Sequence, residues 1–311
     1  MTIGIVAALV VIAGVGAIAL QFAIARDGPA VLSAVDRIAG NTSEAERKAV
    51  ISTGEHPQQK LVVWGRADGG AVETKRPVLI FVHGGSWNSG SPESYDFVGR
   101  TFVPEGFIVV LAGYRLGKEG EYPGMLEDTA GAIGWTHREI AQFGGDPERI
   151  VLAGHSAGAY NVVMAALEER WLAREGLSST HIAGVVGLAG PYDFFPFDSE
   201  STKAAFGDAI EPEATQPIAH VRADAPPKLL IHGEKDDTVK IRNTRELARR
   251  IEAAGGRVTV RTYADMTHRD PLMALAAPWR SRTDIADLIA EFAHEVASPG
   301  TVSVPVQAKT R

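Results

Sequence analysis

The chain has 311 residues, of which 45% are hydrophobic and 22% are charged, and this ordinary globular composition is enough to bury a core. It contains no cysteine, which excludes thiol catalysis and disulfide staples. Its formal net charge of −7, without a basic stripe, argues against nucleic acid as a partner. Because no linker divides residues 60–297, we expect one large domain there.

The N-terminal segment is apolar, and between Ile3 and Ala25 only Gln21 would resist a bilayer. Such a run is long enough to span about 30 Å of hydrocarbon as a helix. Its uncharged start lacks the basic residues of a secretory signal, which favours a membrane anchor. Residues 23–25 also fit a small-x-small cleavage site. We therefore expect a single membrane-anchoring helix over residues 1–25, with a signal peptide and a periplasmic or secreted product as the alternative.

Residues 26–59 are mixed in polarity and are interpreted as a connector with a short helix near residues 43–51. From residue 60 onward, short runs of Val, Ile and Leu alternate with longer amphipathic stretches, which is typical of an α/β fold with a mostly parallel sheet and helices on both faces. Residues 298–311 show no periodicity and are predicted to be a flexible tail. The predicted strands are residues 61–64, 78–82, 108–111, 150–153, 185–188, 228–232 and 258–263, and the predicted helices are residues 126–143, 157–170, 242–254 and 283–296.

A G-x-S-x-G sequence at residues 154–158 follows directly after a predicted strand and precedes a predicted helix. A serine on such a tight strand-to-helix turn adopts a strained backbone that projects its hydroxyl, and the glycines let neighbouring chains pass closely. The N-terminus of the following helix faces any developing anion. Ser156 is therefore the candidate nucleophile.

A second glycine turn, with the sequence H-G-G-S-W, follows another predicted strand at residues 83–87. Unobstructed backbone N–H groups can stabilise the tetrahedral oxyanion that forms during ester cleavage. We assign these donors to Gly85, Ser86 and Ala157. We expect His83 to hold the loop and not to act in catalysis.

The nucleophile needs a base, because a serine hydroxyl is scarcely ionised near neutral pH, and histidine suits this role best. In the fold that such an elbow indicates, the acid and then the base follow the serine along the chain. His268 lies in a loop directly after the predicted strand at residues 258–263, which makes it the candidate base. The other histidines that follow the serine are His181, His220, His232, which ends a buried run, and His294, which lies in a polar helical stretch.

The acid is expected in the loop that follows the preceding strand, at residues 232–239, where its task is to accept the other ring N–H of the base. Spacing alone leaves the choice among the nearby carboxylates open. The candidates are Glu234, Asp236, Asp237 and Asp265.

Five motifs in order resemble the carboxylesterase branch of the α/β-hydrolases, which includes hormone-sensitive-lipase-like esterases and a bacterial feruloyl-esterase-like group. The resemblance covers residues 62–296 and implies the α/β-hydrolase fold and a Ser-His-Asp triad that hydrolyses acyl or aryl esters without a cofactor. It also implies Asp236 as the acid, at the fifth position of H-G-x-x-D. The motifs are H-G-G-x-W at residues 83–87, A-G-Y-R-L at 112–116, F-G-G-D-P at 143–147, G-H-S-A-G at 154–158 and H-G-x-x-D-x-x-V at 232–239.

Two positions depart from this pattern. Ser86 stands where a third glycine often occurs, and residues 265–267, Asp-Met-Thr, replace small glycine-rich residues that often precede the catalytic histidine. Neither change removes a backbone donor or the imidazole. The H-G-G-x-W sequence also resembles kynurenine formamidases, so an arylformamidase with the same triad is the alternative hypothesis. A non-catalytic, membrane-tethered binding protein is the third.

The substrate contacts are expected from loops at the ends of the strands. Trp87 lies beside the oxyanion loop, and Tyr192 and Phe194 follow a predicted strand, so we expect these aromatic residues to form a substrate wall. Residues 190–227 could form a small cap. No long N-terminal cap is recognised, which indicates an accessible site and small ester substrates. The sequence has no metal-ligand spacing and no phosphate-binding or dinucleotide motif, so we expect neither a metal nor a cofactor.

Overall fold

The fold is that of a computed structural model, which describes residues 23–24, 26–40, 44–68 and 75–298. The membrane-anchoring helix expected over residues 1–25 lies almost entirely outside the described residues, as does the tail expected after residue 298. Within the described ranges, no helix combines the length and the apolar character needed to cross a bilayer. The anchor therefore stays a prediction.

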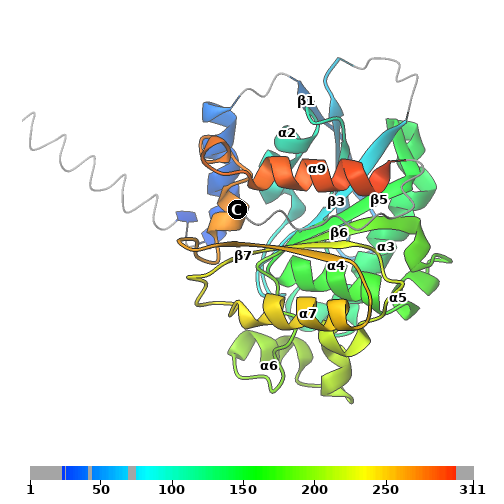
Figure 1. Cartoon of the computed structure of the whole chain (residues 1–311). Coiled ribbons are helices and arrows are strands. Elements are labelled where there is room, and N and C mark those ends of the chain that lie inside the picture. The colour runs from blue at the N-terminus through cyan, green and yellow to red at the C-terminus, as the bar shows by residue number, and fades with distance from the viewer. Residues whose placement is uncertain (1–22, 25, 41–43, 69–74, 299–311) are drawn as a thin grey trace, which may run out of the picture.

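An eight-stranded sheet forms the centre of the molecule (Figure 1), in the order β1-β2-β4-β3-β5-β6-β7-β8. Strand β2 is antiparallel to both of its neighbours, β1 and β4, and all other neighbouring pairs are parallel. The prediction of a mostly parallel sheet is thus confirmed. The strands are β1 Ala45–Ser52, β2 Lys60–Arg66, β3 Arg76–Val82, β4 Ile108–Ala112, β5 Gly145–His155, β6 Ile182–Leu188, β7 Lys228–Gly233 and β8 Val258–Tyr263.

The helices lie between and around these strands. Their bounds are residues 26–39 for the N-terminal helix, α2 Asp96–Phe102, α3 Gly124–Glu139, α4 Ala157–Leu167, α5 Arg170–Ala173, α6 Glu200–Phe206, α7 Arg242–Ala253, α8 Asp270–Met273 and α9 Ile285–Ala297. Short 3-10 helices are η1 Pro92–Tyr95, η2 Gly117–Gly120, η3 Ile140–Phe143, η4 Ser179–His181, η5 Pro212–Thr215, η6 Pro217–His220 and η7 Arg280–Arg282.

Helices cover both faces of the sheet (Figure 1), as the alternation of strands and amphipathic stretches predicts. On one face, α3, α4 and α7 close an apolar core that includes Val78, Ile80 and Val82 of β3. On the other face, α2, α9 and the N-terminal helix close a second core that includes Leu79 and Phe81. Successive side chains of a strand point to opposite faces, so β3 supplies both cores in turn.

The helix predicted near residues 43–51 is wrong, because residues 45–52 form β1, the antiparallel edge strand beside β2. Its start, Ala-Glu-Arg-Lys, favours a helix locally, but pairing with the buried strand β2 decides the outcome. Residues 26–39, interpreted as part of a connector, form a helix that packs on the domain. Its residue Leu32 is 7% exposed within the second core.

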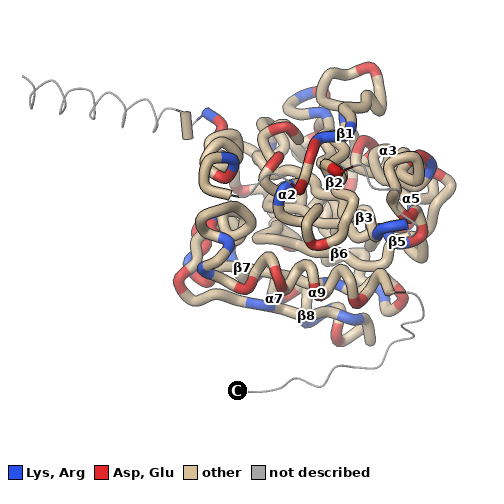
Figure 2. Tube along the Cα trace, turned by 90° about the horizontal axis from the view of Figure 1, so that it is seen from above, with Lys and Arg blue, Asp and Glu red and all other residues tan. Residues whose placement is uncertain are grey.

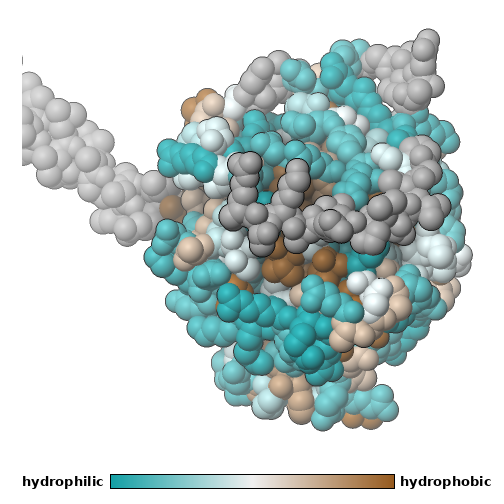
Figure 3. Space-filling model, in the orientation of Figure 1, coloured by the Kyte–Doolittle hydropathy of each residue, from teal (hydrophilic) through white to brown (hydrophobic). Residues whose placement is uncertain are grey.

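The charges of the described elements are of both signs. Figure 2 shows acidic and basic residues interspersed over the described elements. The face in Figure 3 is mostly hydrophilic, with hydrophobic residues gathered near its centre. This distribution fits helices that turn their apolar sides toward the sheet.

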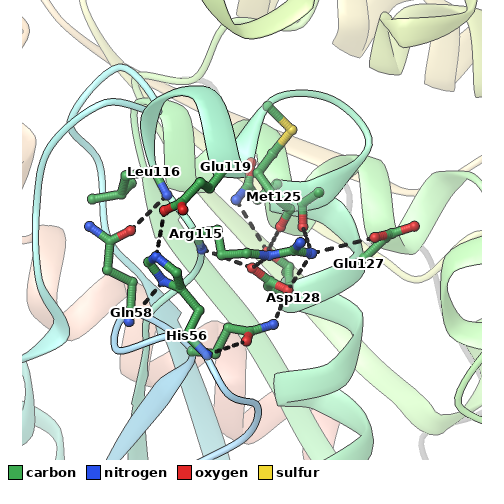
Figure 4. A network of polar contacts seen from close by, with 12 residues as sticks. His56, Gln58, Arg115, Leu116, Glu119, Met125, Glu127 and Asp128 are labelled. Atoms are coloured by element: carbon green, nitrogen blue, oxygen red, sulfur yellow. Dashed lines mark hydrogen bonds and ion pairs between the residues drawn. The ribbon is translucent and has the colours of Figure 1, made fainter.

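A polar network fixes the loop that follows β4 (Figure 4). The Arg115 guanidinium and its backbone N–H all donate to the Asp128 carboxylate of α3, over 2.8–2.9 Å. Gln59, next to β2, donates to the same carboxylate at 2.7 Å. Further along the loop, the backbone N–H of Gly117 donates to the carbonyl of Trp87 at 2.8 Å. The network therefore supports the turn at the end of β3 that contains the predicted oxyanion donors.

A buried ion pair fastens the N-terminal helix to the domain. Arg100 of α2 donates to Asp36 at 2.6 Å, and the two side chains are 5% and 3% exposed. The second Asp36 oxygen accepts the backbone N–H of Ala277 at 2.8 Å, and Arg100 also donates to the Ser33 carbonyl and hydroxyl at 2.9 Å. Because both Asp36 oxygens accept hydrogen bonds and Arg100 donates to two residues of the helix, the pair fixes the position of the helix relative to α2 and to the segment after α8.

We expect Arg100→Ala to lower the free energy of unfolding by about 3–5 kcal/mol, because it leaves the Asp36 carboxylate buried without its partner. Urea denaturation of the variant beside the wild type measures this difference. Arg37→Ala, on the exposed side of the same helix, serves as the control and should stay within about 0.5 kcal/mol of the wild type. Equal stability of the Arg100 variant and the wild type would contradict the role given to the pair.

Candidate active site

The turn between β5 and α4 holds Ser156 in a strained conformation, with φ 54° and ψ −121°. A non-glycine residue rarely adopts a positive φ, and here the surrounding contacts impose it. A Cβ atom at Gly154 would lie 2.4 Å from the backbone of Gly158, and a Cβ atom at Gly158 would lie 2.1 Å from the carbonyl oxygen of Val82. Both glycines of the G-x-S-x-G sequence are thus required by close backbone packing, and the turn projects the serine hydroxyl away from the sheet.

The structure brings together the three side chains that the sequence analysis singled out. Nε2 of His268 lies 2.9 Å from Oγ of Ser156, and Nδ1 of His268 lies 2.8 Å from Oδ2 of Asp236. Ser156 follows β5, Asp236 follows β7 and His268 follows β8, so all three lie at the carboxyl ends of parallel strands. This chain of contacts lets the imidazole accept the serine proton while the carboxylate holds the opposite ring N–H.

The Asp236 carboxylate is buried and accepts hydrogen bonds on both oxygens. Oδ1 accepts the backbone N–H groups of Thr238 and Val239 at 2.9 and 2.8 Å, and Oδ2 faces His268 and, at 3.1 Å, Nε2 of His232. Burial alone raises the pKa of Asp236, but the hydrogen bonds from the two histidines outweigh it and hold this pKa well below its usual range. The neighbouring Asp237 is exposed. The carboxylate beside the base is therefore ionised and fixed in orientation.

His232, which the sequence analysis set aside as the end of a buried run, contacts this carboxylate. Its Nδ1 lies 2.8 Å from Oγ1 of Thr244, and its Nε2 lies 2.8 Å from the carbonyl oxygen of Val239 as well as close to Asp236. The carbonyl and the carboxylate can only accept, so the network requires the proton on Nε2 and has Thr244 donating to Nδ1. The contact could have been predicted from the H-G-x-x-D motif, in which His232 and Asp236 are the first and fifth residues.

The predicted oxyanion donors lie in a turn with unusual backbone angles. Gly85 has φ 121° and Ser86 has φ 52°, and both residues line a cavity together with Ser156. A Cβ atom at Gly85 would lie 2.0 Å from the Ser89 carbonyl oxygen, so only glycine fits there. Within the described residues, no hydrogen bond uses the backbone N–H of Gly85 or of Ser86. Ala157, the third predicted donor, is the first residue of α4.

His83 lies beneath this turn and is 1% exposed. Its ring stacks on Tyr114 with the centroids 4.5 Å apart, and its Nδ1 lies 2.8 Å from the Gly84 carbonyl. Tyr114 in turn donates to the His83 carbonyl at 3.2 Å. These contacts agree with the expectation that His83 holds the loop.

The three aromatic residues predicted to form a substrate wall do not line the cavity at Ser156. Trp87 and Tyr192 are 4% and 0% exposed, and Trp87 packs against Phe194 and Phe206 and donates to Asn161 at 3.1 Å. Neither these two residues nor Phe194 belongs to the lining of the cavity at Ser156. Large aromatic side chains gain more from burial in the core than from exposure in a pocket, and this explains the error.

The cavity at Ser156 instead lies between the predicted oxyanion turn, α8 and the N-terminal helix, and has a volume of about 560 Å³. The N-terminal helix contributes Val31, Leu32 and Val35 to its lining. The sequence analysis recognised no long N-terminal cap and did not predict that this helix lines the cavity. Polar residues between the apolar ones made residues 26–59 look like a connector, although the apolar residues recur with helical spacing.

The lining of the cavity also contains a second histidine, His155, which directly precedes Ser156. Its Nε2–H donates a hydrogen bond to the carbonyl oxygen of His268 over 3.0 Å. In the described part of the chain, no three His, Asp or Glu side chains gather as metal ligands would. His155 therefore supports the loop that carries His268.

The sheet order, the elbow after β5 and the triad-like contacts define an α/β-hydrolase. The sequence model of the BD-FAE family matches residues 69–251, and the chain belongs to this family. Among solved structures, a truncated form of a carbohydrate esterase from gut microbiota has a TM-score of 0.69 at 19% identity, covering 82% of this chain and 99% of that one. Native esterase Est2 of Thermogutta terrifontis has a TM-score of 0.66 at 22% identity, covering 86% and 98%. These likenesses show the fold.

Similar sequences include two proteins of Mycobacterium tuberculosis. Esterase LipC is 34% identical over 64% of this chain and 54% of its own length, and esterase LipQ is 32% identical over 75% and 58%. The isoprenylcysteine alpha-carbonyl methylesterase ICME of Arabidopsis thaliana is 27% identical over 78% of this chain and 60% of its own length. The chain thus spans somewhat more than half the length of these relatives.

We expect the free energy of unfolding to fall as the pH is lowered from 6.5 toward 4. Burial lowers the pKa of His83 to about 4 and the pKa of His155 to about 3, from an ordinary value of 6.5. In this range the unfolded chain binds protons that the folded protein does not, so acidification favours unfolding. The loss should amount to roughly 2–3 kcal/mol for each histidine.

Urea denaturation at pH 7.0, 5.5 and 4.5 measures this decline in the wild type and in His155→Gln, which keeps a donor for the His268 carbonyl. The variant should show the shallower decline. His294→Gln changes an exposed histidine and should follow the wild type. An identical decline in all three proteins would show that His155 is not the source of the acid sensitivity.

Proposed function

We propose that the protein is a carboxylic ester hydrolase that works through an acyl-enzyme on Ser156. The observation that carries this proposal is the continuous hydrogen-bonded chain from Ser156 through His268 to Asp236, which opens on a cavity. Membership of the BD-FAE family and the esterase names of similar proteins from two kingdoms support it.

In the first step, Oγ of Ser156 attacks the ester carbonyl carbon while its proton passes to Nε2 of His268. The tetrahedral intermediate collapses, the bond to the alcohol oxygen breaks, and His268 returns the proton to the leaving alcohol. In the second step, water loses a proton to His268 and attacks the carbonyl carbon of the acyl-enzyme to form a second tetrahedral intermediate. When this intermediate collapses, the bond to Oγ breaks, His268 returns the proton to Oγ, and the carboxylic acid is released. Asp236 stabilises the imidazolium in both steps.

The negative charge on the carbonyl oxygen needs donors that are already in place. The free backbone N–H groups of Gly85 and Ser86 beside Ser156, together with Ala157 at the N-terminus of α4, suit this role. Each such donor contributes a factor of about 10²–10³ to the rate in enzymes of this kind.

Ser156→Ala should abolish the hydrolysis of short p-nitrophenyl esters, with kcat reduced by roughly 10⁴–10⁶, because no other group can form the acyl-enzyme. A fluorophosphonate probe should label the folded wild type at Ser156 and leave the variant unlabelled. Equal turnover by the two proteins would defeat the proposal. Absence of labelling would instead favour a binding protein without catalytic activity.

The two adjacent aspartates provide a matched pair of variants. Asp236→Asn should lower kcat for the same esters by about 10⁴, because an amide cannot hold the imidazole in the required tautomer or stabilise its positive charge. Asp237→Asn changes the exposed neighbour and should leave kcat within about twofold, a margin typical of surface substitutions. The reverse order of effects in steady-state kinetics would reassign the acid.

An arylformamidase would use the same three residues. The resemblance to formamidases rests on the H-G-G-x-W sequence, but Trp87 is buried against Asn161 and does not line the cavity. Ester hydrolysis is therefore the proposal that the geometry favours. Comparing kcat/KM for N-formylkynurenine with kcat/KM for simple aryl esters separates the two activities, and a clear preference for the formyl amide would reverse this conclusion.

A further inference from the structure

The cavity beside Ser156 is far larger than an acetyl or methyl group requires. Its volume of about 560 Å³ lies within the range of about 300–1,000 Å³ found for sites that bury drug-sized ligands. Most of its lining is apolar, and its polar residues include Ser156, His155, His268 and Arg269. Because the reacting carbonyl must lie at Ser156, the apolar side chains of the lining can contact only a part of the substrate that does not react.

Apolar side chains of this lining come from two segments far apart in sequence. The N-terminal helix contributes Val31, Leu32 and Val35, whose spacing places them on one side of the helix. Leu272 and Met273 of α8 belong to the same lining. In Figure 1 the N-terminal helix, in blue, lies beside the orange segment that contains α8. Apolar side chains offer water no hydrogen bonds, whereas a bound hydrocarbon chain is stabilised because its apolar surface is removed from water.

The N-terminal helix is held rigidly enough to shape a binding site. Its Asp36 forms the buried ion pair with Arg100 and accepts the N–H of Ala277, a few residues beyond α8. Asp27, near its start, accepts a hydrogen bond from Ser94 at 2.7 Å. One side of the helix is thus fastened to the domain while the adjacent side faces the cavity. The Asp36 carboxylate therefore connects the N-terminal helix to the segment that follows α8.

We propose that this cavity binds an extended apolar chain of the ester, and that the N-terminal helix is the element that selects for it. The substrate class is then esters with an acyl or alkyl chain of about eight carbons or more, in place of the small esters expected from the sequence. The inference rests on the proposed function, because it concerns the same nucleophile. It gives residues 26–39 a role in specificity.

Two series of esters measure the preference. In one, p-nitrophenyl esters carry acyl chains of two, four, eight and twelve carbons; in the other, acetate esters carry alcohol chains of the same lengths. In at least one series, kcat/KM of the wild type should rise roughly two- to fourfold for each added methylene up to eight carbons, as burial of each methylene implies. The series that rises identifies the half of the ester that enters the cavity.

Val35→Trp and Val31→Trp fill the cavity from the helix side, and Met273→Trp fills it from α8. Each should flatten the rise, lowering the ratio of kcat/KM for the eight-carbon ester to kcat/KM for the two-carbon ester at least tenfold. Ile38→Trp is the control, because Ile38 lies on the same helix, is 87% exposed and is not in the lining. It should keep the profile of the wild type.

The outcomes separate this inference from the proposed function. A wild type that cleaves no ester at all would defeat the function itself. A wild type that cleaves short esters with a flat profile in both series would overturn the chain-binding cavity and leave the triad standing. A rising profile that none of the three tryptophan variants flattens would also overturn the chain-binding cavity. So would an equal loss of kcat/KM for short and long esters in all three variants, because the cavity would then have no role separate from catalysis.

Discussion

The architecture of the site depends on the close approach of three backbone segments at the elbow after β5. Gly158 lies against the Val82 carbonyl and Gly154 lies against Gly158, so that no side chain can be added at either glycine without moving a strand or a helix. This packing forces Ser156 into its positive φ and places its hydroxyl at the carboxyl edge of the sheet. It also brings the turn after β3 within reach of the serine, because a Cβ atom at Gly84 would lie 3.2 Å from the Ser156 Cβ. Ser156 and the predicted oxyanion donors are therefore positioned by one steric constraint.

Much of the sheet could be predicted from the sequence, because runs of β-branched residues buried on both faces leave a local pattern. Ser156 could also be predicted, because the glycines on either side of it indicate a tightly packed turn. His268 could be predicted because its loop directly follows a strand. The choice of Asp236 over Asp237 had no such local signal, since the two differ only in which one the turn buries. It needed the position within the H-G-x-x-D motif.

The errors came from segments whose structure is decided by distant partners. β1 is a strand because it pairs with β2, although its first residues favour a helix. Trp87 and Tyr192 follow strand ends, where pocket residues are common, yet both turn into the core. The N-terminal helix was obscured because its Asp36 suggests a solvated connector, whereas Arg100, brought near only by the fold, makes that carboxylate a buried anchor. In each case the deciding contact joins residues that the linear pattern does not bring together.

The attachment of the N-terminal helix has an evolutionary implication. The strands and the loops that hold Ser156, Asp236 and His268 share no residue with this helix, which is attached to the domain through Asp36, Asp27 and the buried Leu32. Substitutions at Val31 or Val35 can therefore reshape the cavity without disturbing the elbow or the acid–base pair. A fold arranged in this way can acquire new substrates by varying one wall of its cavity while the residues that carry the chemistry stay unchanged.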